Sequence, residues 1–122
     1  MATHTEGNKR TFIATTALEP FRLVTVDSSG QVGYTGLAGA FDGSTDDRAN
    51  TALDPVSVRL RSASGTHKLT ASKSIAAGAL VYPVANGKIT DASNATVVGR
   101  ALEAASGDGS VIEVLVFNTN AV

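Results

Sequence analysis

Residues 56–61 read Val-Ser-Val-Arg-Leu-Arg, and this alternation of apolar and polar side chains has the two-residue period of a β-strand. One face of such a strand is apolar and the other polar, as in an antiparallel strand buried on one side. Shorter runs of strand-forming residues occur elsewhere in the chain, at 11–16, 21–26, 31–34, 80–84, 88–90 and 111–117. The sequence therefore predicts an all-β protein of short strands.

Turn signals separate these runs. Ser28-Ser29-Gly30 lies between the runs 21–26 and 31–34, and Asn86-Gly87 lies between 80–84 and 88–90. Asn and Gly tolerate a positive φ, so Asn-Gly between two strands is a strong hairpin signal. Both pairs of runs are therefore predicted to be β-hairpins.

The chain is similar to itself at a shift of about 57 residues. The pairs at this shift are Phe12 with Leu69, Ala14 with Ala71, Leu23-Val24 with Leu80-Val81, Gly30 with Gly87, and Val32 with Ile89; Gly39 matches Gly99 at 60, and Val56, Val58 and Leu60 match Ile112, Val114 and Val116 at 56. Two related halves of about 50 residues each, 11–61 and 68–117, are too small to bury separate cores. We expect them to pack together as one small β-sandwich or barrel-like domain over residues 11–122.

Residues 1–10 are polar and show no periodicity, which predicts a flexible N-terminal arm. Ten extended residues span about 33 Å, enough to reach a neighbouring molecule.

The composition excludes several classes of function. The chain has no Cys and a net charge of −1, which argues against thiolate metal sites and against DNA binding by phosphate neutralisation. We therefore expect no nucleic-acid partner. No segment has the length of apolar sequence needed for a signal peptide or a membrane span, so we expect no membrane partner either. The hydrophobic residues, 43% of the chain, are mostly small. A core of small side chains buries little area, which favours help from oligomerisation.

Catalytic and cofactor signals are weak. The two histidines, His4 and His67, have no nucleophile elbow or metal-ligand spacing around them, so we expect neither an enzyme nor a cofactor. The acidic stretch Asp42–Asp47 has oxygen ligands that suit Ca²⁺, but it also has the composition of an ordinary solvated turn. Both interpretations of that loop stay open at this point.

Four segments together resemble the capsid cement, or head decoration, proteins of tailed bacteriophages. They are Phe21-Arg22-Leu23-Val24-Thr25-Val26-Asp27 with Gly30-Gln31-Val32; Pro55-Val56-Ser57-Val58-Arg59-Leu60; Ile75-Ala76-Ala77-Gly78-Ala79-Leu80-Val81-Tyr82 with Gly87-Lys88-Ile89; and Val98-Gly99-Arg100-Ala101-Leu102-Glu103-Ala104-Ala105 with Ile112-Glu113-Val114-Leu115-Val116. The chain departs from the family pattern at residues 43–52, where a polar insertion lengthens a loop.

The resemblance implies a structural virion protein that binds the exterior of an assembled capsid, with the major capsid protein as partner, after assembly in the host cytoplasm. It also implies a homotrimer and no catalytic residues. For contact with the capsid or a neighbouring subunit we expect arm residues and the polar face of the strand at 56–61, namely Thr3, His4, Thr5, Lys9, Arg10, Arg59 and Arg61. A solvated or cross-strand-paired face is the alternative for the last two. A carbohydrate-binding β-sandwich on a virion or cell surface is the alternative function, and a small hydrolase is a third.

Overall fold

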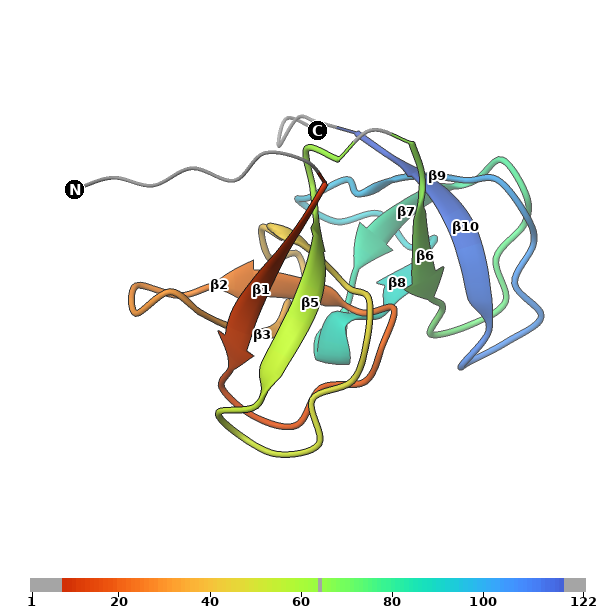
Figure 1. Cartoon of the computed structure of the whole chain (residues 1–122). Coiled ribbons are helices and arrows are strands. Elements are labelled where there is room, and N and C mark those ends of the chain that lie inside the picture. Colours follow the sequence, from red (N-terminus) through yellow and green to blue (C-terminus); the bar gives the residue numbers. More distant parts are fainter. Residues whose placement is uncertain (1–7, 64, 118–122) are drawn as a thin grey trace.

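The computed structural model describes residues 8–63 and 65–117, and its regular elements there are strands and one turn of 3-10 helix (Figure 1). The first half contains β1 (Lys9–Ala14), β2 (Leu23–Val26), β3 (Gln31–Tyr34), β4 (Gly43–Thr45) and β5 (Pro55–Leu60). The second half contains β6 (His67–Thr70), β7 (Leu80–Pro83), η1 (Ala85–Gly87), β8 (Ile89–Thr90), β9 (Gly99–Ala101) and β10 (Val111–Val116). No helix in these residues is long and apolar enough to cross a membrane.

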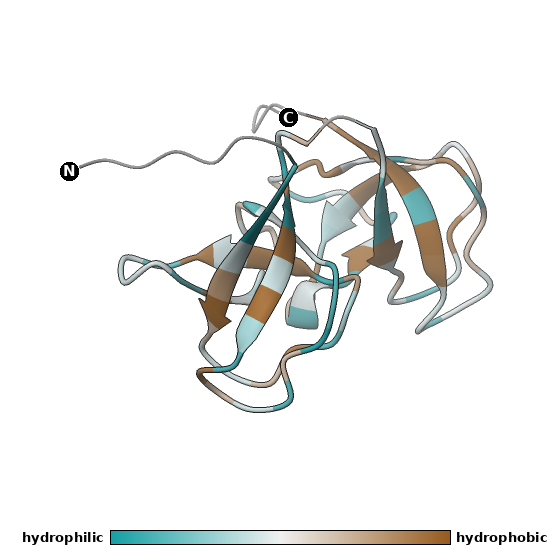
Figure 2. Cartoon of the chain, in the orientation of Figure 1, coloured by the Kyte–Doolittle hydropathy of each residue, from teal (hydrophilic) through white to brown (hydrophobic). Residues whose placement is uncertain are grey.

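The first half is a closed barrel with the strand order β1-β3-β2-β4-β5. β1 pairs antiparallel with β5 along most of its length and parallel with β3 at its end, where Ile13 lies opposite Gln31. The alternation that predicted β5 is visible along that strand in Figure 2, and it places Val56 and Val58 inside the barrel.

The second half has the strand order β6-β10-β9-β7-β8. A parallel bridge between Ala71 and Ile89 brings the residue after β6 beside β8, as β1 lies beside β3 in the first half. With β6 to β10 in the places of β1 to β5, the two halves have the same cyclic order of strands. The expectation of an all-β fold with two similar halves is therefore confirmed.

Equivalent contacts recur in both halves. The bridge between Leu18 and Ala49 corresponds to the bridge between Ile75 and Ala105. One prediction about this correspondence is wrong: the partner of Gly99 is Gly43, and not Gly39. Gly43 lies opposite Leu60 in β4–β5, just as Gly99 lies opposite Val116 in β9–β10. The shift between halves is thus 56 residues from this point onward.

The polar segment at residues 43–52 also differs from its prediction as a lengthened loop. Its first three residues, Gly43, Ser44 and Thr45, are buried and form β4, which closes the barrel between β2 and β5. At the start of the chain, β1 begins at Lys9, so the last two residues of the predicted arm belong to a strand. The hairpin turn at Asn86-Gly87 is confirmed, with φ of 65° and 69°.

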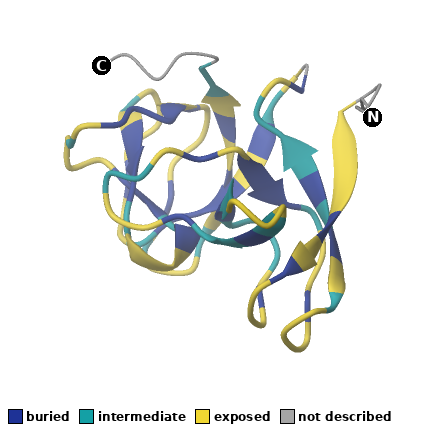
Figure 3. Ribbon diagram, turned by 90° about the vertical axis from the view of Figure 1, so that its left-hand side faces the viewer, coloured by how far each residue is buried: buried dark blue, intermediate teal, exposed yellow. Residues whose placement is uncertain are grey.

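The two halves share part of their core. Buried residues occur along the strands of both halves (Figure 3). Leu23 and Phe41 belong to the first half, yet both pack into the core of the second half, beside residues such as Leu69 and Ile89. The first half therefore supplies part of the hydrophobic interior of the second.

Candidate functional site

A cleft of about 850 Å³ runs between the two halves. The first-half elements β1, β4 and β5 form one wall, and β6, β10 and the loop after β9 form the other. Its lining residues are Lys9, Phe21, Ser44, Thr45, Asp46, Arg59, Thr66, Lys68, Glu103, Val111, Ile112 and Glu113. The cleft is thus lined by charged residues of both signs.

Most of these charges are engaged within the chain. Lys9 Nζ lies 2.6 Å from Asp46 Oδ2, and Thr66 Oγ1 donates to Glu113 Oε2 at 2.6 Å. Glu103 Oε1 accepts a hydrogen bond from the Glu113 backbone N–H at 2.8 Å. The carboxylates of the cleft therefore hold its walls in place.

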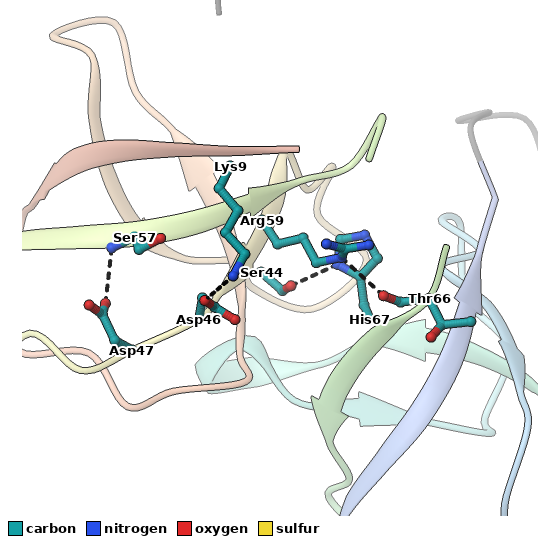
Figure 4. A network of polar contacts seen from close by, with 8 residues as sticks. All are labelled: Lys9, Ser44, Asp46, Asp47, Ser57, Arg59, Thr66 and His67. Carbon is teal, nitrogen blue, oxygen red and sulfur yellow. Dashed lines mark hydrogen bonds and ion pairs between the residues drawn. The ribbon is translucent and has the colours of Figure 1, made fainter. Parts of the chain in front are cut away.

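Two residues of the cleft, Ser44 of β4 and Arg59 of β5, point toward His67 at the start of β6 (Figure 4). Ser44 Oγ lies 2.8 Å from His67 Nδ1, and Arg59 Nε donates to the backbone oxygen of Thr66 at 3.0 Å. Burial, together with the charge of Arg59, lowers the pKa of His67 to about 4. His67 is therefore neutral at pH 7.

This Ser–His contact does not form a catalytic triad. Both side chains are buried, each with 2% of its surface exposed, so Ser44 Oγ is not presented to a substrate. Among the described residues none hydrogen-bonds His67 Nε2, whereas a triad places a carboxylate on the second ring nitrogen. A histidine with so low a pKa is also a weak general base at pH 7. The pair joins the two halves.

Arg61 joins the halves at a second point. Its guanidinium lies over the ring of Phe41 at 4.1 Å, and Nε donates to the backbone oxygen of Phe117 at 3.1 Å. Burial lowers the pKa of Arg61, and the carboxylate of Asp42 opposes this effect. Arg59 in β5 and Arg61, directly after the end of β5, both contact the second half of the same chain.

The predicted arm residues divide into two groups. Thr3, His4 and Thr5 lie outside the described residues. Lys9 and Arg10 lie in β1, where Lys9 faces the cleft and Arg10 lies over the ring of Phe12 at 4.8 Å. The structure therefore brings Lys9 and Arg59 to the same cleft, while Arg10 is exposed and does not line it.

The acidic loop uses its carboxylates locally. Asp42 accepts a hydrogen bond from Val26 N–H at 2.8 Å, and Asp47 accepts one from Ser57 N–H at 2.9 Å. Across residues 8–63 and 65–117, no cluster of three or more His, Asp or Glu residues could hold a metal ion. The middle of this segment is the buried strand β4, and the carboxylates of Asp42 and Asp47 on either side of it bind backbone N–H groups of other strands.

Two features of the structure were not predicted from the sequence. Leu80 and Leu115 are exposed on the outer face of the second half, although we expected the final strand only as a largely apolar run. Leu53 is 66% exposed and has a φ of 70°, which is rare for a branched side chain. The alternation in residues 111–117 places Leu115 on the same face as Glu113, and this signal could have revealed the first feature.

Comparison with known proteins agrees with this all-β architecture. A family model described as phage cement protein matches residues 4–116. The chain belongs to the phage cement protein family. It is therefore a structural protein of the phage capsid, as its resemblance to capsid cement proteins implied. A search of the curated proteins found no match.

This cement protein also resembles a solved structure, the N base of the head fiber protein gp8.5 of bacteriophage phi29. The TM-score is 0.78 at 15% sequence identity, over 93% of this chain and 97% of that chain. A likeness at this identity concerns the fold, which is shared over 93% of this chain.

Proposed function

We propose that this phage cement protein binds the exterior of the assembled capsid as a homotrimer and stabilises the shell, with the major capsid protein as its partner. The match of the family model to residues 4–116 carries this proposal. The virion is then its final location, after assembly in the host cytoplasm.

The physical basis is mass action. A protein that binds the assembled shell but not the free subunits stabilises the shell by RT ln(1 + [L]/Kd) at each site. Many equivalent sites on an icosahedral shell add up these increments. Because the carboxylates and the arginine of the cleft are engaged within the chain, its chemistry suits a rigid binding module better than an enzyme.

The arm is our candidate for capsid contact, with Thr3, His4 and Thr5 and, three residues further on, Lys9 and Arg10 at the start of β1. A polar segment of this kind can add to the edge of a sheet in a neighbouring protein. Arg10 is exposed and places a positive charge beside this segment, where shell carboxylates can meet it.

Co-sedimentation with empty capsids tests the proposal. The full chain should sediment with capsids and raise their melting temperature, while a variant without residues 2–7 should keep its fold and bind more weakly. The deletion ends before β1, so it leaves the barrel complete. Full-strength binding by the shortened chain would exclude the arm, and no sedimentation of the intact protein would refute capsid binding itself.

A further inference from the structure

One row of the first half is covered by the second half of the same chain. Leu23 of β2, Ser44 of β4 and Arg59 of β5 lie side by side in the ladder. The η1 turn lies against Leu23 so closely that a Cβ added to Gly87 would come within 2.5 Å of the Leu23 backbone oxygen. His67 and Thr66 cover the other two residues. This contact within the chain serves as a model for how an equivalent row of residues could be covered by a partner.

The equivalent row of the second half is uncovered. Leu80 of β7, Arg100 of β9 and Leu115 of β10 lie side by side in the same way, and Leu80 and Leu115 are 39% and 43% exposed. Leu102 adds a further exposed leucine just beyond β9. Leu80 stands where Leu23 stands in the first half, but Leu23 is only 1% exposed.

Arg100 lies at the centre of this leucine surface. Within the part of the chain that the structure describes, its guanidinium has no hydrogen bond, ion pair or ring contact, and the residue is exposed. Arginine amid apolar side chains is typical of the energetic centre of a protein interface. Such a surface fits an apolar partner that also carries a carboxylate.

We propose that the row Leu80–Arg100–Leu115 binds the β2–β3 turn of a second copy of this chain, with Asp27 of that copy paired to Arg100. The β2–β3 turn takes the place of η1, which covers Leu23 within the chain. Asp27 Oδ1 accepts hydrogen bonds from the backbone N–H groups of Ser29 and Gln31, both at 2.9 Å. These bonds hold the carboxylate at the base of the turn and leave Oδ2 available for the guanidinium.

The turn itself is open to such a contact. Residues 27–30 are exposed, and a Cβ added to Gly30 would meet nothing within 4 Å. A strict copy of the internal contact would also bring Arg10 toward Arg100, because Arg10 takes the place of His67. The carboxylate of Asp27 offsets that repulsion, which is why we place the turn at the centre of the contact.

The two surfaces are different patches of one chain, so the contact is head-to-tail. Head-to-tail contacts close into rings when the rotation between copies allows it. This inference rests on the homotrimer in the proposed function and specifies which surfaces meet.

Light scattering and sedimentation equilibrium of charge variants test the pair. Arg100→Gln and Asp27→Asn, which keeps the acceptor of the turn, should each weaken self-association about tenfold, and the double variant should be little worse than either single one. Arg48→Gln is the matched control, because Arg48 pairs with Glu19 on another surface. Independent, additive effects of the two substitutions would contradict the pairing.

A cross-linking experiment keeps the test independent of folding energetics. The chain has no cysteine, so Ser29→Cys with Leu80→Cys introduces a single defined pair. Oxidation should give covalent oligomers, whereas the control pair Thr51→Cys with Leu80→Cys should stay monomeric on a denaturing gel.

The outcomes separate this inference from the proposed function. An unmodified protein that is monomeric at all concentrations would overturn both the trimer and this contact. A trimer that survives the Arg100 and Asp27 variants and fails to cross-link would overturn the contact alone. Variants that stay trimeric but lose capsid co-sedimentation would reassign the leucine row to the capsid.

Discussion

Leu53 holds a backbone conformation that its equivalent in the second half, Gly109, adopts without strain. Their φ values are 70° and 90°. A branched L-residue pays about 1–2 kcal/mol in this region, while glycine adds about 0.5–1 kcal/mol of unfolded-state entropy. Because Leu53 is mostly exposed, Leu53→Gly should raise the free energy of unfolding by about 0.5–1 kcal/mol, as measured in urea.

Leu37→Gly is the control for Leu53→Gly. Leu37 is 71% exposed and is not among the residues with positive φ, so glycine there should be neutral or destabilising. Strained, exposed residues are often retained for contact. If Leu53 contacts the capsid, the stabilised variant should bind capsids more weakly; equal loss of stability in both variants would remove the strain argument.

His67 makes the stability of the protein depend on pH. Its folded pKa is about 4, below the ordinary value of 6.5, so the unfolded chain takes up a proton first as the pH falls. The stabilisation that comes from keeping His67 neutral is present above about pH 6.5 and is lost as the pH falls toward 4. The free energy of unfolding should therefore fall by about 2 kcal/mol between pH 7 and pH 5. Urea unfolding of the unmodified protein and of His67→Gln at both pH values measures this, and the variant should lose much less. Parallel pH profiles of the two proteins would show that His67 does not titrate in this way.

At the scale of elements, two glycines let neighbouring strands approach. A Cβ at Gly99 would lie 1.9 Å from the Leu115 backbone oxygen, and one at Gly43 would lie 2.5 Å from the Arg59 oxygen. Gly99→Ala should therefore force β9 away from β10 and cost about 3 kcal/mol or more in unfolding free energy. Gly107→Ala, with nothing within 4 Å, is the control and should change stability by less than about 0.5 kcal/mol. Equal melting temperatures for the two variants would contradict the close packing of this strand pair.

Gly43 and Gly99 also mark the limit of what could be predicted from the sequence. Strands such as β5 and β3 could be predicted because their own residues show the two-residue alternation of apolar and polar side chains that is typical of a strand. β4 could not, since Gly43–Thr45 has no apolar alternation and becomes a strand only by pairing with β2 and β5, which are distant in the sequence. For the same reason Gly39 seemed an acceptable partner for Gly99.

The contacts of Arg59 and Arg61 at the candidate site could also be predicted only in part. The shared face of Arg59 and Arg61 followed from the two-residue period, but what that face contacts depends on where the second half lies. Only the packing of the halves assigns Arg59 to Thr66 and Arg61 to Phe41 and Phe117.

At the scale of the whole molecule, the two halves have similar strands but unequal surroundings. The first half buries its outer row under the second, and the second half leaves its own row in solvent. The two halves therefore present different surfaces, as the proposed head-to-tail contact requires.

Equivalent leucines test this asymmetry directly. Leu23→Ala removes a buried side chain from the core that both halves share, so it should cost about 2–5 kcal/mol and lower a single unfolding transition for the whole domain. Leu80→Ala, at the equivalent but exposed position, should cost less than about 1 kcal/mol in the dissociated protein. Calorimetry at low concentration measures both. A core shared by both halves should make them unfold together. Two separate transitions in Leu23→Ala would therefore contradict this coupling and show that the halves unfold independently.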